Sequence, residues 1–153
     1  MKYRKAIFSD VEPIFHLIND YATDGQMLPR SRNTLYETLR DMVVAEDNAG
    51  KIVGVGGLHM MWDGLAEVRA MAIHPDSSRQ GIGTKIVEML LDEGRVLGVK
   101  TVFTLTYKPA FFQTLGFEVV SKDSLPHKVW KECIECPKFP NCDEIAMMRS
   151  MKR

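Results

Sequence analysis

Hydrophobic and polar positions near the N-terminus follow a helical period. Apolar residues recur on one helix face at Val11, Ile14, Phe15 and Ile18. This spacing predicts a helix that Ser9 or Asp10 caps and that ends near residue 22. A second helix is predicted to begin at Ser31, whose hydroxyl can cap it, with Leu35 and Leu39 on one side.

Shorter runs of apolar and β-branched residues predict strands, and turn residues separate them. The predicted strands cover residues 2–8, 42–46, 52 onward, 66–73, 101–106, 117–120 and 144–149. Residues 47–51 form one turn, and Asp63 with Gly64 forms the hairpin turn before the fourth strand. The glycines at 54, 56 and 57 fit a bulged or closely packed third strand.

An amphipathic helix follows the fourth strand. Its apolar face comprises Ile82, Ile86, Leu90 and Leu97, with Val87 and Leu91 beside it. Shorter helices are predicted over residues 109–115 and 126–134. The order of elements combines an antiparallel meander with one strand–helix–strand crossover. We therefore expect an α/β (α+β) fold, a mixed sheet flanked by helices, as a single domain over residues 1–153.

The bulk composition is typical of a soluble globular protein. The 153 residues are 45% hydrophobic and 26% charged, and Lys+Arg and Asp+Glu number 20 each, so the formal net charge is zero. This balance argues against a nucleic-acid partner, which usually leaves a basic excess. No apolar run approaches the roughly 20 residues that span a bilayer, and the N-terminus lacks a secretory pattern. We expect a cytoplasmic protein without a membrane partner; the oligomeric state stays open, a homodimer included.

Three cysteines lie close together in the sequence, at Cys133, Cys136 and Cys142. An odd number without an export signal indicates reduced thiols rather than a disulfide framework. Their spacing resembles part of a zinc or iron–sulfur site, but a structural zinc needs a fourth ligand, for which His127 is the nearest candidate. We therefore expect no metal.

The segment after the fourth strand predicts an anion site. The strand ends at His74-Pro75, a short polar loop follows, and Gly81 and Gly83 then open a helix. Backbone N–H groups at a helix start have no partner inside the helix, and the helix dipole adds positive potential, so a pyrophosphate can bind there. The Walker pattern is absent, and the dinucleotide fingerprint would need a third glycine where Ile86 stands.

Two motifs in this order resemble the GNAT family of acetyl-CoA-dependent N-acetyltransferases. The first is the strand ending in Ile73-His74-Pro75 with the glycine-rich turn of residues 79–84 after it. The second is the aromatic pair before Leu-Gly-Phe in residues 111–117. Ser78 departs from the family, which usually has Arg or Gln there. The resemblance implies a sheet splayed at its centre, with acetyl-CoA in the gap as the donor of an acetyl group to an amine.

The resemblance also implies the cofactor contacts. Backbone amides at the end of the key strand are expected to hold the acetyl carbonyl, and the glycine-rich turn is expected to hold the pyrophosphate. These residues are Met71, Ala72 and Ile73, and Arg79, Gln80, Gly81, Ile82, Gly83 and Thr84.

The amine must lose a proton before it attacks, because an ammonium has no lone pair. We favour Glu67 as the base, since many members of the family use a Glu there through water; the alternative is a solvated carboxylate at a strand end. Strand alternation predicts Glu67 on the same face as Arg69, Met71 and Ile73. His74 is a second candidate base.

The general acid of the family is usually a tyrosine in the aromatic pair. Here Phe112 stands at that position and has no proton to give. Tyr107 is the substitute candidate, and an amphipathic aromatic at a strand end is its structural alternative.

Three segments are more similar to the acetyltransferase domains of N-acetylglutamate synthases: residues 25–35, 105–106 and 125–126. This resemblance implies glutamate as the acceptor amine. Glutamate carries two carboxylates, which favour arginine partners. Arg30 matches the substrate-binding arginine of these domains, Ser31 lies beside it, and Arg69 is predicted to face the acetyl site; a surface charge and a strand ion pair are the alternatives.

Two other functions stay open at this point. The chain could acetylate another amine, such as a different amino acid, a polyamine or a protein N-terminus. It could also be a CoA-binding regulator without turnover, which the absent tyrosine and Ser78 weakly favour.

Overall fold

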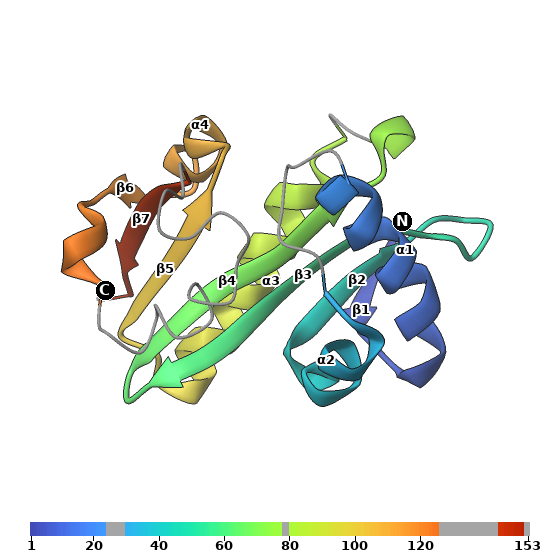
Figure 1. Cartoon of the computed structure of the whole chain (residues 1–153), viewed down its shortest axis with the longest axis horizontal. Coiled ribbons are helices and arrows are strands. Elements are labelled where there is room, and N and C mark those ends of the chain that lie inside the picture. The colour runs from blue at the N-terminus through green and yellow to red at the C-terminus, as the bar shows by residue number, and fades with distance from the viewer. Residues whose placement is uncertain (24–29, 78–79, 126–143, 152–153) are drawn as a thin grey trace. The chain divides into compact units, whose positions relative to one another are not determined.

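Seven strands and four α-helices make up the part of the chain that the computed structural model describes, residues 1–23, 30–77, 80–125 and 144–151 (Figure 1). The strands are β1 (Lys2–Lys5), β2 (Met42–Glu46), β3 (Ile52–Trp62), β4 (Leu65–Ile73), β5 (Thr101–Thr106), β6 (Glu118–Val119) and β7 (Ile145–Ser150). The α-helices are α1 (Val11–Thr23), α2 (Arg32–Glu37), α3 (Ile82–Leu97) and α4 (Pro109–Gln113).

The strands pair in the order β1-β2-β3-β4-β5-β7-β6. The pairs β1–β2, β2–β3, β5–β7 and β6–β7 are antiparallel, whereas β4 and β5 are parallel. A parallel neighbour needs a crossover, and α3 supplies it. This mixed seven-stranded sheet with flanking helices confirms the predicted fold class.

The ladder between β4 and β5 is short. It covers three residue pairs, from Leu65–Thr101 to Glu67–Phe103, and then ends. Strand β5 nevertheless pairs with β7 along its whole length, from Thr101–Ser150 to Thr106–Ile145. The sheet is therefore interrupted between β4 and β5, where the sequence resemblance predicts a splay.

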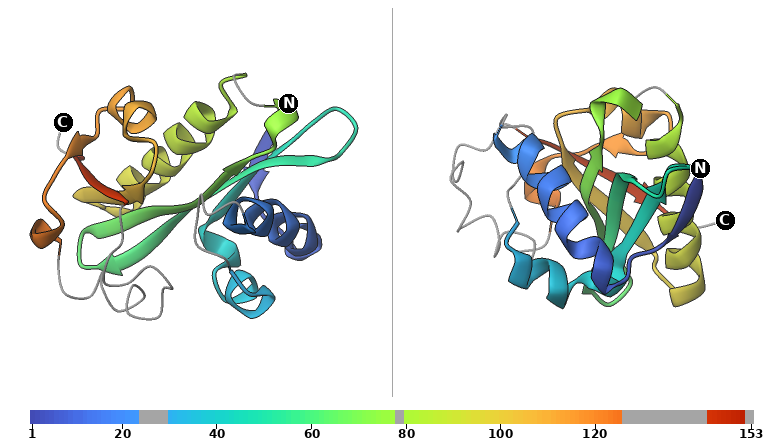
Figure 2. Two further views of the ribbon diagram at one scale, coloured as in Figure 1. Left: turned by 45° about the horizontal axis from the view of Figure 1, so that its top comes forward. Right: turned by 90° about the vertical axis from the view of Figure 1, so that its right-hand side faces the viewer.

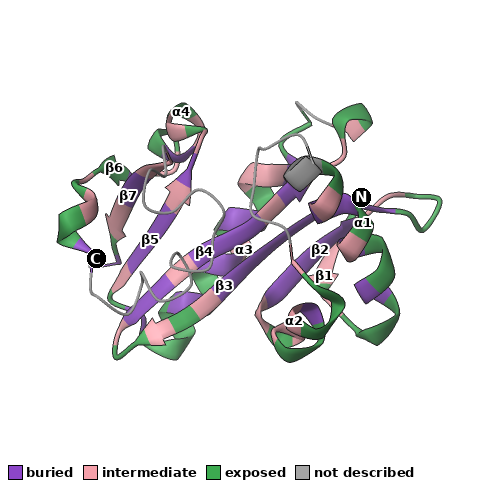
Figure 3. Cartoon of the chain, viewed as in Figure 1, coloured by how far each residue is buried: buried purple, intermediate pink, exposed green. Residues whose placement is uncertain are grey.

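Contacts within the chain define two units. The first comprises Met1–His59 and Val68–Leu97, and the second comprises Met60–Glu67 and Gly98–Arg153. In the first unit, α1 and α2 cover one face of the strands and α3 covers the other (Figure 2). Strands β2 and β4 and the first part of β3 are mostly buried between these helices (Figure 3).

The packing on the two faces of β3 explains its glycines. A Cβ on Gly54 would lie 2.9 Å from Cγ2 of Ile82, and a Cβ on Gly56 would lie 2.7 Å from Cγ2 of Ile86. Helix α3 therefore approaches the strand so closely that larger residues do not fit. Side chains on the opposite face form the core beneath α1 and α2, namely Val11, Ile14, Leu17, Ile18, Leu35, Met42, Val44, Ile52, Val55, Ala70 and Ala72.

The first strand and first helix differ from the prediction. Strand β1 ends at Lys5, and a 3₁₀ turn, η1 (Phe8–Asp10), runs directly into α1. Asp10 is thus the third residue of the turn, not its cap, and its carboxylate accepts a hydrogen bond of 2.8 Å from the N–H of Ile7. Arg4 holds the same carboxylate at 2.7 and 3.0 Å, and this ion pair ends the strand early.

The second unit has its own core. Leu65, Phe103, Leu125 and Ala146 are buried together there. In the predicted aromatic motif, Phe112 stacks edge-to-face on Phe111 and Phe117, with ring centroids 5.0 and 5.2 Å away. Phe112 is buried, so this motif supports packing at a position where a proton donor was sought. The predicted helix over residues 126–134 and the cysteines lie outside the described residues.

Candidate active site

A left-handed residue interrupts β4. Ala70 has φ +58°, and among the described residues it is the only one other than glycine with positive φ. The αL conformation costs an L-residue about 1–2 kcal/mol, and Ala70 keeps it while only 9% exposed. Such a kink within a strand breaks the regular ladder and redirects backbone groups, a device that recurs beside active sites.

Side chains alternate between the two faces of β4 from Ala70 onward. Met71 and Ile73 both lie toward α3, since a Cβ on Gly56 would overlap Sδ of Met71 and a Cβ on Gly54 would lie 3.1 Å from Cδ1 of Ile73. Ala70 and Ala72 belong to the core on the opposite face. The predicted shared face is therefore confirmed for residues 71 and 73, and it stays a prediction for Glu67 and Arg69.

Hydrogen bonds hold the end of β4 in place. The N–H of His74 donates to the carbonyl of Val53 at 2.7 Å, and Pro75–Ser77 then forms a 3₁₀ turn. Nδ1 of His74 accepts from the N–H of Asp76 at 3.2 Å, and its Nε2 lies 3.5 Å from Nζ of Lys51. With both ring nitrogens engaged, His74 fits a structural role at this turn better than the role of a base.

The start of α3 is open and suited to an anion. Gly81 has φ +76°, and a Cβ placed on it would meet nothing within 4 Å. Its carbonyl accepts from the N–H of Lys85 at 3.1 Å, and the first turn of α3 contains no acidic residue. The unpaired N–H groups of a helix start and the helix dipole favour negative charge here.

The predicted cofactor residues at the start of α3 differ in how exposed their side chains are. Gln80 is exposed, Gly83 and Thr84 are half-buried, and the side chain of Ile82 is buried. Ile82 can therefore reach a ligand only through its backbone. Arg79 lies outside the described residues.

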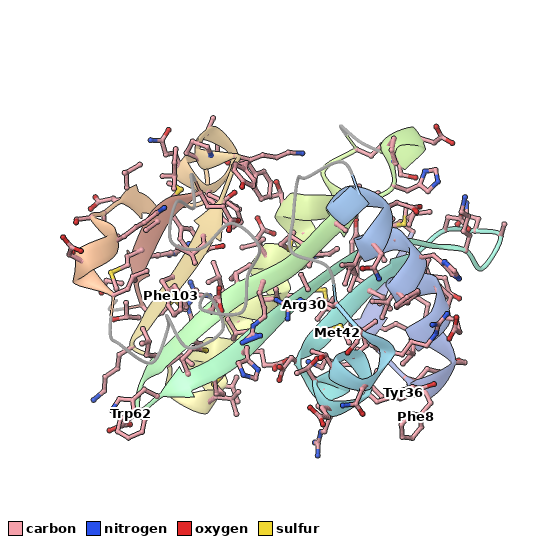
Figure 4. The ribbon with its side chains drawn as sticks, in the orientation of Figure 1. Phe8, Arg30, Tyr36, Met42, Trp62 and Phe103 are labelled. Atoms are coloured by element: carbon pink, nitrogen blue, oxygen red, sulfur yellow. The ribbon has the colours of Figure 1, made fainter. Side chains whose placement is uncertain are left out.

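Asn19 of α1 fixes the backbone of Arg30. Its amide nitrogen donates to the carbonyl of Arg30 at 3.1 Å and to that of Phe15 at 2.7 Å, and its oxygen accepts from the N–H of Arg30 at 3.2 Å. The side chain of Arg30 is half-buried with its Nε inaccessible, and Figure 4 shows it on the side of the strands that α2 covers. Asn19 is absent from the sequence predictions, because a polar residue in an amphipathic helix carries no local signal of what it binds.

The two residues after Arg30 have partners within the chain. Ser31 caps α2 as predicted, with its oxygen accepting from the N–H of Thr34 at 3.1 Å. Arg32 pairs with Glu12 and lies 3.9 Å above the ring of Phe15, so α1 holds it. The hydrogen bond from Arg32 is the main reason that the pKa of Glu12 is lowered.

The remaining predicted residues differ in how deeply they are buried, and they belong to different units of the chain. Arg69 is 8% exposed, with its Nε buried, and belongs to the first unit. Glu67 and Tyr107 belong to the second unit, and both are partly exposed. Glu67 is the last residue of β4 that pairs with β5, and Tyr107 follows β5 directly. Glu67 therefore lies where the ladder to β5 ends, and Tyr107 lies just beyond the last residue of β5.

The described part of the chain shows neither a cluster of metal ligands nor a membrane-spanning helix. Residues 1–23, 30–77, 80–125 and 144–151 contain no group of three or more His, Cys, Asp or Glu side chains arranged to hold a metal. In the same ranges, no helix has the length and apolar character needed to cross a membrane.

Residues 38–119 match the family model described as the acetyltransferase (GNAT) domain. An uncharacterized N-acetyltransferase of Chlorobaculum tepidum is 35% identical over 148 residues, which are 97% of this chain and 95% of that protein. An amino-acid acetyltransferase of Mycobacterium tuberculosis is 39% identical over 132 residues, 84% of this chain and 75% of that protein.

Solved structures agree with these sequence matches. Rv2747 of Mycobacterium tuberculosis, in complex with CoA and NLQ, superimposes with a TM-score of 0.85 at 32% identity, covering 98% of this chain and 99% of that one. N-acetylglutamate synthase of Neisseria gonorrhoeae, complexed with coenzyme A and N-acetyl-glutamate, gives a TM-score of 0.89. It covers 99% of this chain and 35% of that one, and at 23% identity it shows the fold alone.

Proposed function

This chain belongs to the GNAT family of acetyltransferases, and we propose that it transfers the acetyl group of acetyl-CoA to the α-amine of L-glutamate. The observation that carries the choice of acceptor is the placement of Arg30. Asn19 anchors its backbone by two hydrogen bonds, and its half-buried side chain lies on the side of the strands that α2 covers (Figure 4). A cation built into the fold in this way suits a carboxylate-bearing acceptor better than a polyamine.

The relatives support the same substrate class. One is named an amino-acid acetyltransferase, and a protein of the same fold was solved with N-acetyl-glutamate. In the proposed complex, Arg30, Ser31 and Arg69 contact the acceptor. Arg69 is buried in the strand that carries the kink, so it could hold a second carboxylate only at short range.

Acetyl-CoA is the second substrate in this proposal. The glycine-rich turn of residues 79–84 would hold its pyrophosphate through backbone N–H groups, and residues 71–73 would orient the acetyl carbonyl. The open surface around Gly81, the acid-free first turn of α3 and the kink at Ala70 all fit these roles. The thioester supplies an activated carbonyl carbon with a thiolate as leaving group.

The reaction needs a proton acceptor and a proton donor. Glu67 is proposed to take a proton from the ammonium through a water molecule, so that the amine can form a C–N bond as the C–S bond breaks. Tyr107 is proposed to give a proton to the departing thiolate. An ordinary thiol has a pKa near 8.5, so this donation contributes little and Tyr107 is the less important of the two.

Thiol release tests the proposal directly. The purified chain is mixed with acetyl-CoA and, in separate reactions, L-glutamate, D-glutamate, L-aspartate, L-arginine, spermidine and a peptide with a free N-terminus. Release with L-glutamate far above the other amines is expected. Release with another amine instead would overturn the substrate, and tight acetyl-CoA binding with no release on any amine would identify a regulator without turnover.

A further inference from the structure

A histidine–aspartate pair lies in the first unit, and neither of its residues was among the predicted site residues. Nδ1 of His59, in β3, is 2.6 Å from Oδ2 of Asp41. Asp41 ends the 3₁₀ turn η2 (Leu39–Asp41), directly before β2. The two side chains are 31% and 25% exposed, so solvent or a ligand can reach them. Among the described residues, Nε2 of His59 makes no further hydrogen bond.

The alternation of β3 places His59 on the face of α1 and α2. Val55 is part of the core beneath those helices. Gly57 follows on the same face, and a Cβ on it would lie 3.5 Å from Cγ of Met42 and 3.6 Å from the carbonyl of Arg69. His59 is the next residue of this series. The alternation therefore places the imidazole on the face of β3 that α1 and α2 cover, and Figure 4 shows Arg30 on the same side of the strands. Strand β4 is the neighbour of β3 in the sheet.

We propose that His59, oriented by Asp41, is a catalytic residue that accepts a proton from the amine of the acceptor substrate. This inference rests on the proposed acetyl transfer. A carboxylate that accepts from Nδ1–H fixes the tautomer whose Nε2 carries a lone pair, and this nitrogen makes no hydrogen bond to the described residues. In the same structure His74 has neighbours at both ring nitrogens and lacks this property.

The reaction removes two protons from the amine nitrogen, so Glu67 and His59 can each accept one of them. Between the ammonium of the substrate and the amide of the product, the nitrogen loses two protons. One leaves before attack, and the other leaves when the tetrahedral intermediate collapses. The C–N bond forms, the C–S bond breaks, and the thiolate takes up one proton as the other is passed to solvent. His59 accepts one of these two protons on Nε2 and returns to the neutral imidazole when it releases it.

Replacement of His59 tests the role. His59→Gln keeps a side chain of similar length without an acid–base group, and we expect it to lower kcat by about 10²-fold while the KM of acetyl-CoA changes less than about twofold. His59→Ala should recover part of its turnover when imidazole is added, because a free imidazole can occupy the vacated space. Asp41→Asn should lower kcat by a smaller factor, since it removes the orientation and keeps the base.

Controls separate this inference from a folding defect and from the proposed function. His16→Ala is the matched control, because His16 is an exposed histidine of α1 that pairs with Glu12. Each variant's unfolding midpoint is measured beside its kinetics. If wild type releases thiol with L-glutamate and folded His59→Gln retains turnover within about twofold, the proton role is wrong and the proposed function stands. If wild type acetylates no amine, both are wrong.

Discussion

Gly56 lies where β3 meets α3, and its replacement by alanine should destabilise the protein. A Cβ at this position would lie 2.7 Å from Cγ2 of Ile86 and 3.5 Å from Cδ1 of Leu90, and it would overlap Sδ of Met71. Real Cβ atoms essentially never come within 3.0 Å of such neighbours. The methionine can move its flexible end, but the branched Ile86 is fixed on the helix. Overpacking of this kind costs about 1–3 kcal/mol.

Gly57→Ala is the matched control, one residue away on the opposite face. Its Cβ would meet Met42 at 3.5 Å and two backbone oxygens at 3.6 and 3.7 Å, which are ordinary contacts. Both substitutions reduce the entropy of the unfolded chain equally, which favours folding by about 0.4–1 kcal/mol. The difference between the two variants therefore isolates the packing cost, and Gly56→Ala should be less stable than Gly57→Ala by about 1–3 kcal/mol.

Urea denaturation of wild type and both variants measures this difference, provided that the slope stays constant among them. Gly56→Ala should also raise the KM of acetyl-CoA, because Met71 follows the kinked residue of β4 and its displacement moves the amides proposed to hold the acetyl group. Equal stabilities of the two variants would refute the close packing of α3 on β3. A less stable Gly57→Ala would show that the faces of β3 are assigned the wrong way round.

Three further predictions concern substitutions of single residues. Arg30→Ala should raise the KM of glutamate at least about tenfold and leave the KM of acetyl-CoA nearly unchanged. Asn19→Ala should raise the KM of glutamate by a smaller factor. Steady-state kinetics with each substrate varied in turn tests this, since a general loss of folding would affect both substrates alike. Gly81→Ala should cost about 1 kcal/mol because of its positive φ and weaken acetyl-CoA binding in calorimetry, whereas unchanged affinity would exclude this turn as the phosphate site. Burial alone raises the pKa of Asp10, but hydrogen bonds from Arg4 and the Ile7 N–H outweigh it and hold the pKa below its ordinary value. The stabilisation from Asp10 is then present above the unfolded pKa of about 3.9 and is lost as the pH falls through the folded pKa. At neutral pH the free energy of unfolding of Asp10→Asn should be about 1.5–3 kcal/mol lower than that of wild type, and this difference should shrink in acid. A difference that does not depend on pH would contradict this.

Much of the fold could be predicted because its signals are local. The spacing of apolar residues places α1 and α3 within a few residues of their observed bounds, and Ser31 caps α2 through contacts that span three positions. The hairpin turn at Asp63-Gly64 and the glycine-rich turn before α3 likewise depend on neighbours in the chain. Together with the aromatic motif, these features led to the family that the comparisons confirm.

The predictions failed where a distant partner decides the local geometry. Strand β1 was predicted to reach residue 8, but it ends three residues earlier, at Lys5. The 3₁₀ turn of Phe8–Asp10 follows, and Arg4 pairs with Asp10 across six residues. The left-handed conformation of Ala70 was not predicted either, because alanine has no local preference for it.

The sequence by itself determined the class of the protein: a mixed sheet with a glycine-rich turn between a strand and a helix, in the order typical of GNAT acetyltransferases. Only the tertiary structure decided which polar groups act together. Asn19 meets Arg30 across 11 residues, and Asp41 meets His59 across 18. Periodicity reports which face of an element is buried, but the partner of a polar side chain depends on strand register and helix docking, which long-range packing sets.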